Sequence, residues 1–354
     1  YSSRGPVGQG VIKPDITANG QSVLSTSGDG SGTSKKQGTS MSSPNAAGSA
    51  IVIQDYCSRR LPGHLLRSHT LKGLICHSAD DFGNTGPDYS FGWGILNALE
   101  ACHLIRHYAE HPTSNSLVED FLDPDEVMTY DFTWNGTDPI MATLCWIEPP
   151  GFTHPDSADD RTPDLINDLD IRIIDPEGNE YLPWLMPYVR DGFVDGDHKK
   201  AAERGDNNTD NVEQVLIDDP SLSGTYTVRI SHKGSLKDDA SQHFALCLDG
   251  AADGPAWPAP TIDSIDRTSG SGDQTRVLIE GSGFRFGAQA VLRDGGNEIP
   301  AVAIAEVEDR LIAWWDLAQA PAGTYDVVIR NLDGQEVVET DAFVVQAREI
   351  LLLE

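Results

Sequence analysis

The chain has 354 residues, of which 39% are hydrophobic and 7% aromatic, so its composition is that of a globular protein. This length predicts two or three domains, and no apolar run approaches the ~20 residues that span a bilayer. The net charge of −30 is distributed unevenly along the chain. Residues 1–112 contain 9 Lys and Arg against 8 Asp and Glu, residues 113–257 contain 9 against 30, and residues 258–354 contain 7 against 17. The acidic middle argues against nucleic acid and anionic membranes as partners of that part.

The first segment with a chemical signal is "SKKQGTSMSSPNAAGSA" at residues 34–50. Pro44 suits the first turn of a helix, and the run after it is small or apolar on every side, which predicts a buried helix over residues 44–58. Ser40 then lies at the helix N-terminus, where free N–H groups can stabilise a developing oxyanion. Gly38 leaves room for a substrate backbone. The same serine can instead act only as an N-cap, so this segment alone leaves both interpretations open.

Motifs on either side of this serine favour a nucleophile. Taken in order, they resemble the C-terminal half of the catalytic domain of a subtilisin-like serine protease, over residues 1–112. The sequence departs from the family pattern at Asn19 and Asn45, and neither residue takes part in the chemistry. The motifs that carry the resemblance are SSRGP (2–6), KPDI (13–16), GTSMSSP (38–44) and SFGWGILNALEA (90–101).

The resemblance implies a serine endopeptidase that acts on proteins or peptides. Ser40 is its expected nucleophile, with Gly38 and Thr39 flanking the leaving-group side of the substrate cleft. In this family the acid and the histidine precede the serine by more residues than stand before Ser40 here. We therefore expect them upstream of Tyr1, and we expect the 354-residue fragment alone to be inactive. The chemistry requires no cofactor, and enzymes of this group are secreted or cell-surface proteins of bacterial type.

Six histidines before residue 112 are the candidates within the chain to activate Ser40. They lie on or beside helices predicted over residues 68–78 and 94–110, where such side chains are typically solvated or satisfied surface groups. No spacing directs one of them toward the serine. They are His64, His69, His77, His103, His107 and His111.

From about residue 116, short strand-like runs bounded by Asp, Gly and Pro predict an all-β sandwich or jelly roll. Segments 165–181 and 207–231 resemble the C-terminal jelly roll of one group of secreted bacterial subtilases, and residues 258–347 resemble a TIG-type Ig-like domain. The expected fold is multidomain: a partial α/β subtilisin-like catalytic domain (1–112), an all-β jelly-roll sandwich (113–250), a linker (251–259), an Ig-like β-sandwich (260–347) and a tail (348–354).

Asp168 and Asp170 flank Leu169 on a predicted strand, so both carboxylates project to one side. Hard oxygen ligands of this kind suit calcium, and the two aspartates are the candidate ligands of a structural calcium ion. Ordinary turn chemistry and a solvated acidic surface explain such residues equally well. A second oxygen-rich cluster contains Asp206, Asn207, Asn208 and Asp210.

The five cysteines are few and have no CxxC spacing, which favours free buried thiols. Cys145 and Cys247 lie in two strand-like runs and can pair only if those strands are neighbours.

A second function from another class is a non-catalytic extracellular binding or adhesion protein with a degenerate protease domain. β-Sandwich modules bind partners on many folds, so the fold alone does not decide between the two.

Overall fold

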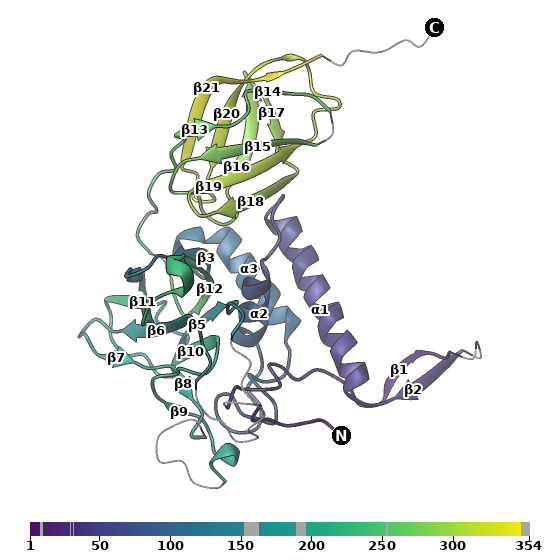
Figure 1. Ribbon diagram of the computed structural model, residues 1–354, viewed down its shortest axis with the longest axis vertical. Helices are drawn as coiled ribbons and strands as arrows, with labels where there is room; N and C mark the ends of the chain where they lie inside the picture. Colours follow the sequence, from purple (N-terminus) through teal and green to yellow (C-terminus); the bar gives the residue numbers. More distant parts are fainter. Residues whose placement is uncertain are drawn as a thin grey trace. The chain divides into compact units, whose positions relative to one another are not determined.

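The structure is a computed structural model that describes residues 1–7, 10–28, 30, 32–151, 163–188, 196–252, 254–272 and 274–347. The predicted tail, 348–354, lies outside the described residues. Within them, most regular structure is β-sheet and the helices lie in the first third of the chain (Figure 1). The α-helices are α1 (Thr39–Arg60), α2 (Ser68–His77) and α3 (Ala98–Glu110).

The chain divides into two compact units. This division does not test the predicted domain boundaries, which remain predictions. The first unit comprises Tyr1–Asp55, Leu66–Ile105 and Ser114–Gly254. The second comprises Tyr56–Leu65, Arg106–Thr113 and Pro255–Glu354.

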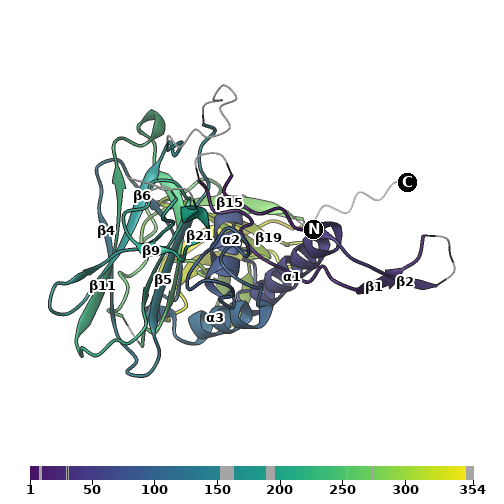
Figure 2. The same cartoon turned by 90° about the horizontal axis from the view of Figure 1, so that it is seen from below.

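Two antiparallel four-stranded sheets of the first unit face each other across one apolar core (Figure 2). Their strand orders are β10-β5-β12-β3 and β4-β11-β6-β7. Alternate side chains of each strand enter the core, as expected for period-2 patterning. The strands are β3 (Leu117–Leu122), β4 (Met128–Thr133), β5 (Ile140–Trp146), β6 (Asp168–Ile174), β7 (Glu180–Tyr181), β10 (Val212–Ile217), β11 (Thr225–Lys233) and β12 (Gln242–Asp249). Two further antiparallel pairs are formed by β1 (Val23–Thr26) with β2 (Thr33–Lys36) and by β8 (Trp184–Leu185) with β9 (Glu203–Arg204).

Strand β5 is buried on both faces because α2 covers the outer side of its sheet (Figure 2). Leu144 and Trp146 enter the core between the two sheets, while Thr143 and Cys145 face the helix. Gly73 of α2 permits this contact, since a Cβ at that position would stand 2.9 Å from the Cβ of Cys145. The helix therefore lies directly on the sheet.

The N-terminus of α2 is satisfied by a carboxylate from the sheet. Glu119 of β3 accepts the backbone N–H of Arg67 at 3.1 Å and the hydroxyl of Thr70 at 2.5 Å. A negative charge at a helix N-terminus complements the helix dipole. Arg67 has no side-chain cap of its own, so this contact from another element replaces a local N-cap.

Asp210 attaches the N-terminal segment to the β part of the first unit. Its Oδ1 accepts the backbone N–H of Ile12 at 2.8 Å, and Asn207 Nδ2 donates to Oδ2 at 3.2 Å. The side chain is buried, and this burial raises the pKa of Asp210 to about 6 despite both hydrogen bonds.

The prediction that the helix-borne histidines are surface groups is wrong for His69 and His77 of α2. Both are buried because α2 turns them toward the sheet. His77 Nδ1 lies 2.8 Å from the hydroxyl of Thr143. Burial lowers the pKa of His69 to about 4.

All five cysteines are free, which confirms the prediction of unpaired thiols. Cys145 and Cys247 lie on the neighbouring strands β5 and β12 without forming a disulfide. Burial raises the pKa of Cys145 to about 12.

The second unit contains two further sheets around its own core, ordered β13-β15-β19-β18 and β14-β21-β20-β16-β17. The ends of α1 and α3 belong to this unit. Tyr108 Oη donates to the carbonyl of Phe286 at 2.6 Å, and the buried His64 places Nε2 2.8 Å from the carbonyl of Ala288. The strands are β13 (Ser264–Ile265), β14 (Ser269–Gly270), β15 (Thr275–Glu280), β16 (Gln289–Asp294), β17 (Asn297–Pro300), β18 (Ala303–Val307), β19 (Arg310–Trp315), β20 (Gly323–Arg330) and β21 (Glu336–Val345).

The contact between α2 and β5 predicts that alanine substitutions at two helical glycines change the free energy of unfolding in opposite directions. Gly48 of α1 has no atom within 4 Å of an added Cβ, so Gly48→Ala should stabilise by up to ~1 kcal/mol through helix propensity. Gly73→Ala gains the same propensity but collides with Cys145, and we expect a net loss of roughly 1–2 kcal/mol. Urea unfolding of both variants measures the difference. A stabilised Gly73→Ala variant would show that the helix can move off the sheet without cost.

The buried carboxyl of Asp210 predicts a pH-dependent loss of stability. Its folded pKa is raised to about 6, so the folded protein binds this proton more tightly than the unfolded chain does. The contribution of this carboxyl to the free energy of unfolding is therefore highest below about pH 4 and falls as the pH rises through 6. For a shift of two pKa units, this contribution decreases by roughly 3 kcal/mol.

We expect Asp210→Asn to flatten this dependence, because its Oδ1 still accepts the Ile12 N–H but carries no charge. The measurement is the free energy of unfolding at intervals between pH 4 and 7. Asp219→Asn, at an exposed position of equal charge, is the matched control. Equal slopes in the two variants would contradict the assignment.

Candidate active site

Ser40 is the second residue of α1, and its side chain is exposed. The helix predicted over residues 44–58 begins earlier, at Thr39, and ends at Arg60. Pro44 is therefore the sixth residue of α1 and lies inside the helix, where it cannot donate an N–H to the carbonyl of Ser40 four residues earlier. The serine is thus part of the first helical turn.

The first turn of α1 leaves backbone donors free near Ser40. The carbonyl of Gly38 accepts the N–H groups of Met41 at 3.0 Å and Ser42 at 3.3 Å. The N–H groups of Thr39 and Ser40 precede any intrahelical acceptor, as at every helix start. Their position at the positive end of the helix dipole favours a developing negative charge beside the hydroxyl.

The turn before Ser40 depends on glycine for its conformation. Gly38 has φ +140°, a region that other residues rarely adopt, and its N–H donates to the carbonyl of Gly20 at 2.9 Å. A Cβ on Gly20 would stand 2.7 Å from the Gly38 carbonyl oxygen. Ser42 Oγ donates to the carbonyl of Ala18 at 2.8 Å. The segment before Gly20 therefore fixes the turn that carries the serine.

An open cleft of about 770 Å³ lies beside this turn. Of the predicted site residues, Thr39 lines the cleft, whereas Ser40 and Gly38 are adjacent in the chain without lining it. Sequence reasoning did not single out Arg4, Ser90 or Phe91, which also line it. The wall is formed by Tyr1, Ser2, Arg4, Pro14, Asp15, Ile16, Thr17, Ala18, Gly20, Gln21, Thr39, Ser42, Ser43, Ala46, Ser90 and Phe91.

Within the described residues, the Ser40 hydroxyl has no hydrogen-bonding partner that could activate it. The candidate histidines of α2 are buried against the sheet. The location of the histidine that would activate Ser40 stays a prediction.

The helix after Ser40 is only partly buried among the described residues. Ile53 and Cys57 are buried, but Ile51 is 69% and Val52 is 58% exposed. Only one stripe of α1 has a covering partner among the described residues, so an apolar face remains open to solvent.

Asp168 and Asp170 project to one side of β6, as predicted, and there they meet Lys233. Its Nζ lies 2.9 Å from Asp170 Oδ1 and 3.4 Å from Asp168 Oδ2. Arg172 forms ion pairs with Asp170 and Asp206. Burial raises the pKa of Asp168 to about 6, with Lys233 opposing the shift and Asp170 adding to it. Two cations thus already neutralise part of this acidic cluster.

No group of three or more His, Cys, Asp or Glu side chains in the described part of the chain is arranged to hold a metal ion. A calcium ion at Asp168 and Asp170 would have to displace the Lys233 ammonium. Calcium binding there stays a prediction.

Comparison with known proteins gives partial matches. Residues 1–94 match the Subtilase family. The Minor extracellular protease Vpr of Bacillus subtilis is 35% identical over 118 residues, which are 30% of this chain and 14% of that protein. The serine protease/ABC transporter B family protein tagD of Dictyostelium discoideum is 22% identical over 243 residues, 50% of this chain and 13% of that protein. The chain therefore spans about a seventh of the length of these relatives.

Among solved structures, a serine protease of Aeromonas sobria shares 12% identity with this chain. The match covers 62% of this chain and 45% of that one. Its TM-score of 0.19 is too low for a common fold to be argued from it. The comparisons thus show that the segment carrying Ser40 is similar to the Subtilase family.

Proposed function

We propose that this protein is a serine-type endopeptidase in which Ser40 is the nucleophile and the activating histidine and acid lie outside residues 1–354. One observation carries the proposal: an exposed serine occupies the first turn of a helix, beside a cleft, within the segment that matches the Subtilase family.

In the proposed reaction the Ser40 hydroxyl gives its proton to the histidine while Oγ forms a bond to the scissile carbonyl carbon. The carbonyl π electrons move to oxygen, and the Ser40 N–H at the start of α1 donates a hydrogen bond to that oxyanion. Collapse of the intermediate expels the amine, which takes the proton from the histidine. Water then hydrolyses the acyl-enzyme by the same steps. Gly38 and Thr39 flank the leaving-group side.

The open face of α1 supports the same proposal. Exposed Ile51 and Val52 on a helix of small residues are unfavourable in water, at about 25 cal/mol per Å² of apolar surface. We propose that the remainder of the catalytic domain covers this face. Its strands would then bring the missing triad members to the N-terminal end of α1.

We further propose that the sheets of residues 113–250 form a jelly roll and those of 260–347 a TIG-type Ig-like domain, and that the protein is secreted. The paired sheets and separate cores support the first proposal. The extracellular location named for the Bacillus subtilis relative supports secretion. No helix in the described part of the chain is long and apolar enough to cross a membrane.

The proposal predicts how a fluorophosphonate probe reacts, since such a probe bonds to an activated serine Oγ with loss of fluoride. The 354-residue chain should remain unlabelled, because removal of the histidine alone costs roughly a million-fold in subtilisin turnover. A chain extended upstream should be labelled at Ser40, located by peptide mass. Ser40→Ala should abolish the label and Ser49→Ala, also on α1, should leave it unchanged.

Two outcomes would contradict the endopeptidase as proposed. Labelling of the 354-residue chain would place a base inside it, with His69 and His77 the first to replace. An extended chain that is folded but unlabelled would favour the non-catalytic binding or adhesion protein.

Calcium at Asp168 and Asp170 remains a proposal with its own measurement. A ligand that binds only the folded state raises stability by RT ln(1 + [L]/Kd). If calcium competes successfully with Lys233, millimolar calcium should raise the melting temperature relative to chelator, and Asp170→Asn should abolish the increase. A melting temperature indifferent to calcium in the unmodified chain would leave the ion pairs with Lys233 as the role of both aspartates.

A further inference from the structure

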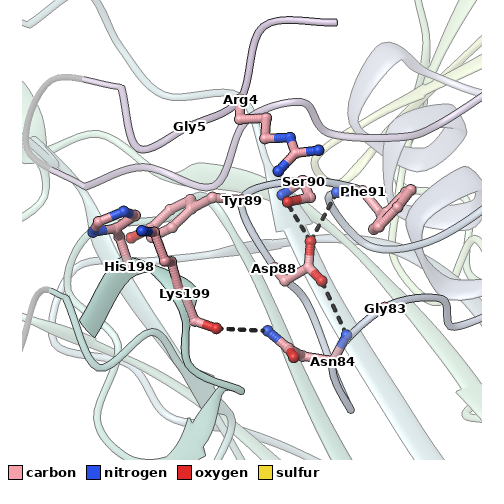
Figure 3. Close-up of a pocket in the computed structure, with 10 residues that line it drawn as sticks. All are labelled: Arg4, Gly5, Gly83, Asn84, Asp88, Tyr89, Ser90, Phe91, His198 and Lys199. Carbon is pink, nitrogen blue, oxygen red and sulfur yellow. Dashed lines mark hydrogen bonds between the residues drawn. The ribbon is translucent and has the colours of Figure 1, made fainter. Parts of the chain in front are cut away.

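A second cavity of about 420 Å³ shares part of its lining with the cleft beside Ser40. Figure 3 shows the residues that line this cavity. Arg4, Ser90 and Phe91 line both spaces. The far side of the cavity comes from the β part of the first unit. There His198 and Lys199 of the 3-10 helix η2 (Asp197–Lys199) line it, in the connection between β8 and β9.

Cationic side chains dominate the unpaired groups of this cavity. Arg4 and Lys199 are exposed, and neither forms an ion pair with any residue that the structure describes. His198 is half-buried and contacts the ring of Tyr188 edge to face. Two cations without ion pairs therefore line one cavity, and together they would attract an anionic ligand.

The one carboxylate of the cavity is already occupied by backbone donors. Asp88 is buried, and its Oδ1 accepts the N–H groups of Ser90 at 2.7 Å and Phe91 at 2.8 Å. Its Oδ2 accepts the N–H of Asn84 at 3.1 Å, as the dashed lines of Figure 3 show. Asp88 therefore shapes the loop rather than neutralising Arg4 or Lys199.

Two further polar side chains of the lining are engaged as well. Tyr89 Oη donates to the carbonyl of Gly10 at 2.6 Å. Asn84 Nδ2 donates to the carbonyl of Lys199 at 3.2 Å, which ties η2 to the loop that contains Asp88. The charged ends of Arg4 and Lys199 thus stay available to a ligand, with the imidazole of His198 and the hydroxyl of Ser90 in the same lining.

We propose that this cavity is a binding subsite for an acidic side chain of a peptide, with Arg4 and Lys199 as its specificity-determining residues. The identity of that peptide as the substrate rests on the proposed function. A volume of about 420 Å³ is within the usual range for a ligand pocket, and Arg and Lys are the residues that bind carboxylates in proteins. An extended chain lying in the cleft reaches the subsite past Ser90 and Phe91, which line both spaces.

The test measures binding without cleavage, so that it does not depend on Ser40 chemistry. Short fluorescein-labelled alanine peptides with amidated C-termini carry a single Glu at each position in turn, with Gln peptides as isosteric controls. Fluorescence anisotropy at low salt gives their affinities for the 354-residue chain carrying Ser40→Ala. We expect the best Glu peptide to bind roughly fivefold more tightly than its Gln counterpart, and the preference to weaken in concentrated salt.

Charge-removing variants locate the preference. Arg4→Gln and Lys199→Gln should each reduce the Glu-over-Gln ratio toward one. Lys200→Gln removes the same charge from the next residue, which does not line the cavity, and should leave the ratio unchanged. Thermal melting of each variant checks that it is folded.

Three outcomes would overturn the proposal: equal affinity for Glu and Gln peptides, an equal loss in Lys199→Gln and Lys200→Gln, or a phosphoserine peptide that binds much more tightly than any Glu peptide. The last would make a phosphoryl group the ligand. Failure of the fluorophosphonate test with the Glu preference intact would overturn only the proposed enzymatic function, because binding is measured without the nucleophile.

Discussion

The close contact between α2 and β5 is the constraint on which the first unit depends. Gly73 allows the helix to lie on the strand at Cys145, and Glu119 satisfies the helix N-terminus from the neighbouring part of the same sheet. Because α2 covers the outer face, β5 has no solvent-exposed side and its sequence is apolar or small throughout. Lys72 of α2 then reaches Asn211 at 3.0 Å and Asp15 at 3.2 Å, which attaches the N-terminal loops to the same sheet.

The contacts that attach the N-terminal loops to the sheet also determine the shape of the cleft beside Ser40. Its wall combines the first residues of the chain, the start of α1 and the loop at Ser90, which are distant in sequence. The buried Asp210 carboxylate orders the N-terminal segment by accepting the N–H of Ile12. Further along this segment, the carbonyl of Gly20 accepts the N–H of Gly38 and so orders the turn before Ser40. The exposed serine is therefore positioned by a chain of backbone contacts that originates in the β part of the unit.

Sequence patterns correctly predicted those features of the structure that depend on interactions between residues close in sequence. Pro44 and the small residues after it predicted a helix next to Ser40, and the side chains of β19 alternate between buried and half-buried as period-2 patterning requires. Trp315 is in the core and Trp314 is half-buried. Burial of both faces of β5 could not be predicted, because nothing in "MATLCWI" indicates the distant helix that covers it. The approach of Lys199 to the cavity of Arg4 is likewise tertiary, although "HKK" within an acidic stretch was a signal that could have been followed.

The helix that covers β5 also isolates a layer of thiols from the surroundings of the protein. Cys76, Cys145 and Cys247 are buried at this contact, and burial raises the pKa of each, so none presents the thiolate that oxidants attack. Packing thus protects these thiols from oxidants in the surroundings. An oxidising environment would reach them only through an opening of α2 from its sheet, and oxidation in the opened state would prevent the helix from returning.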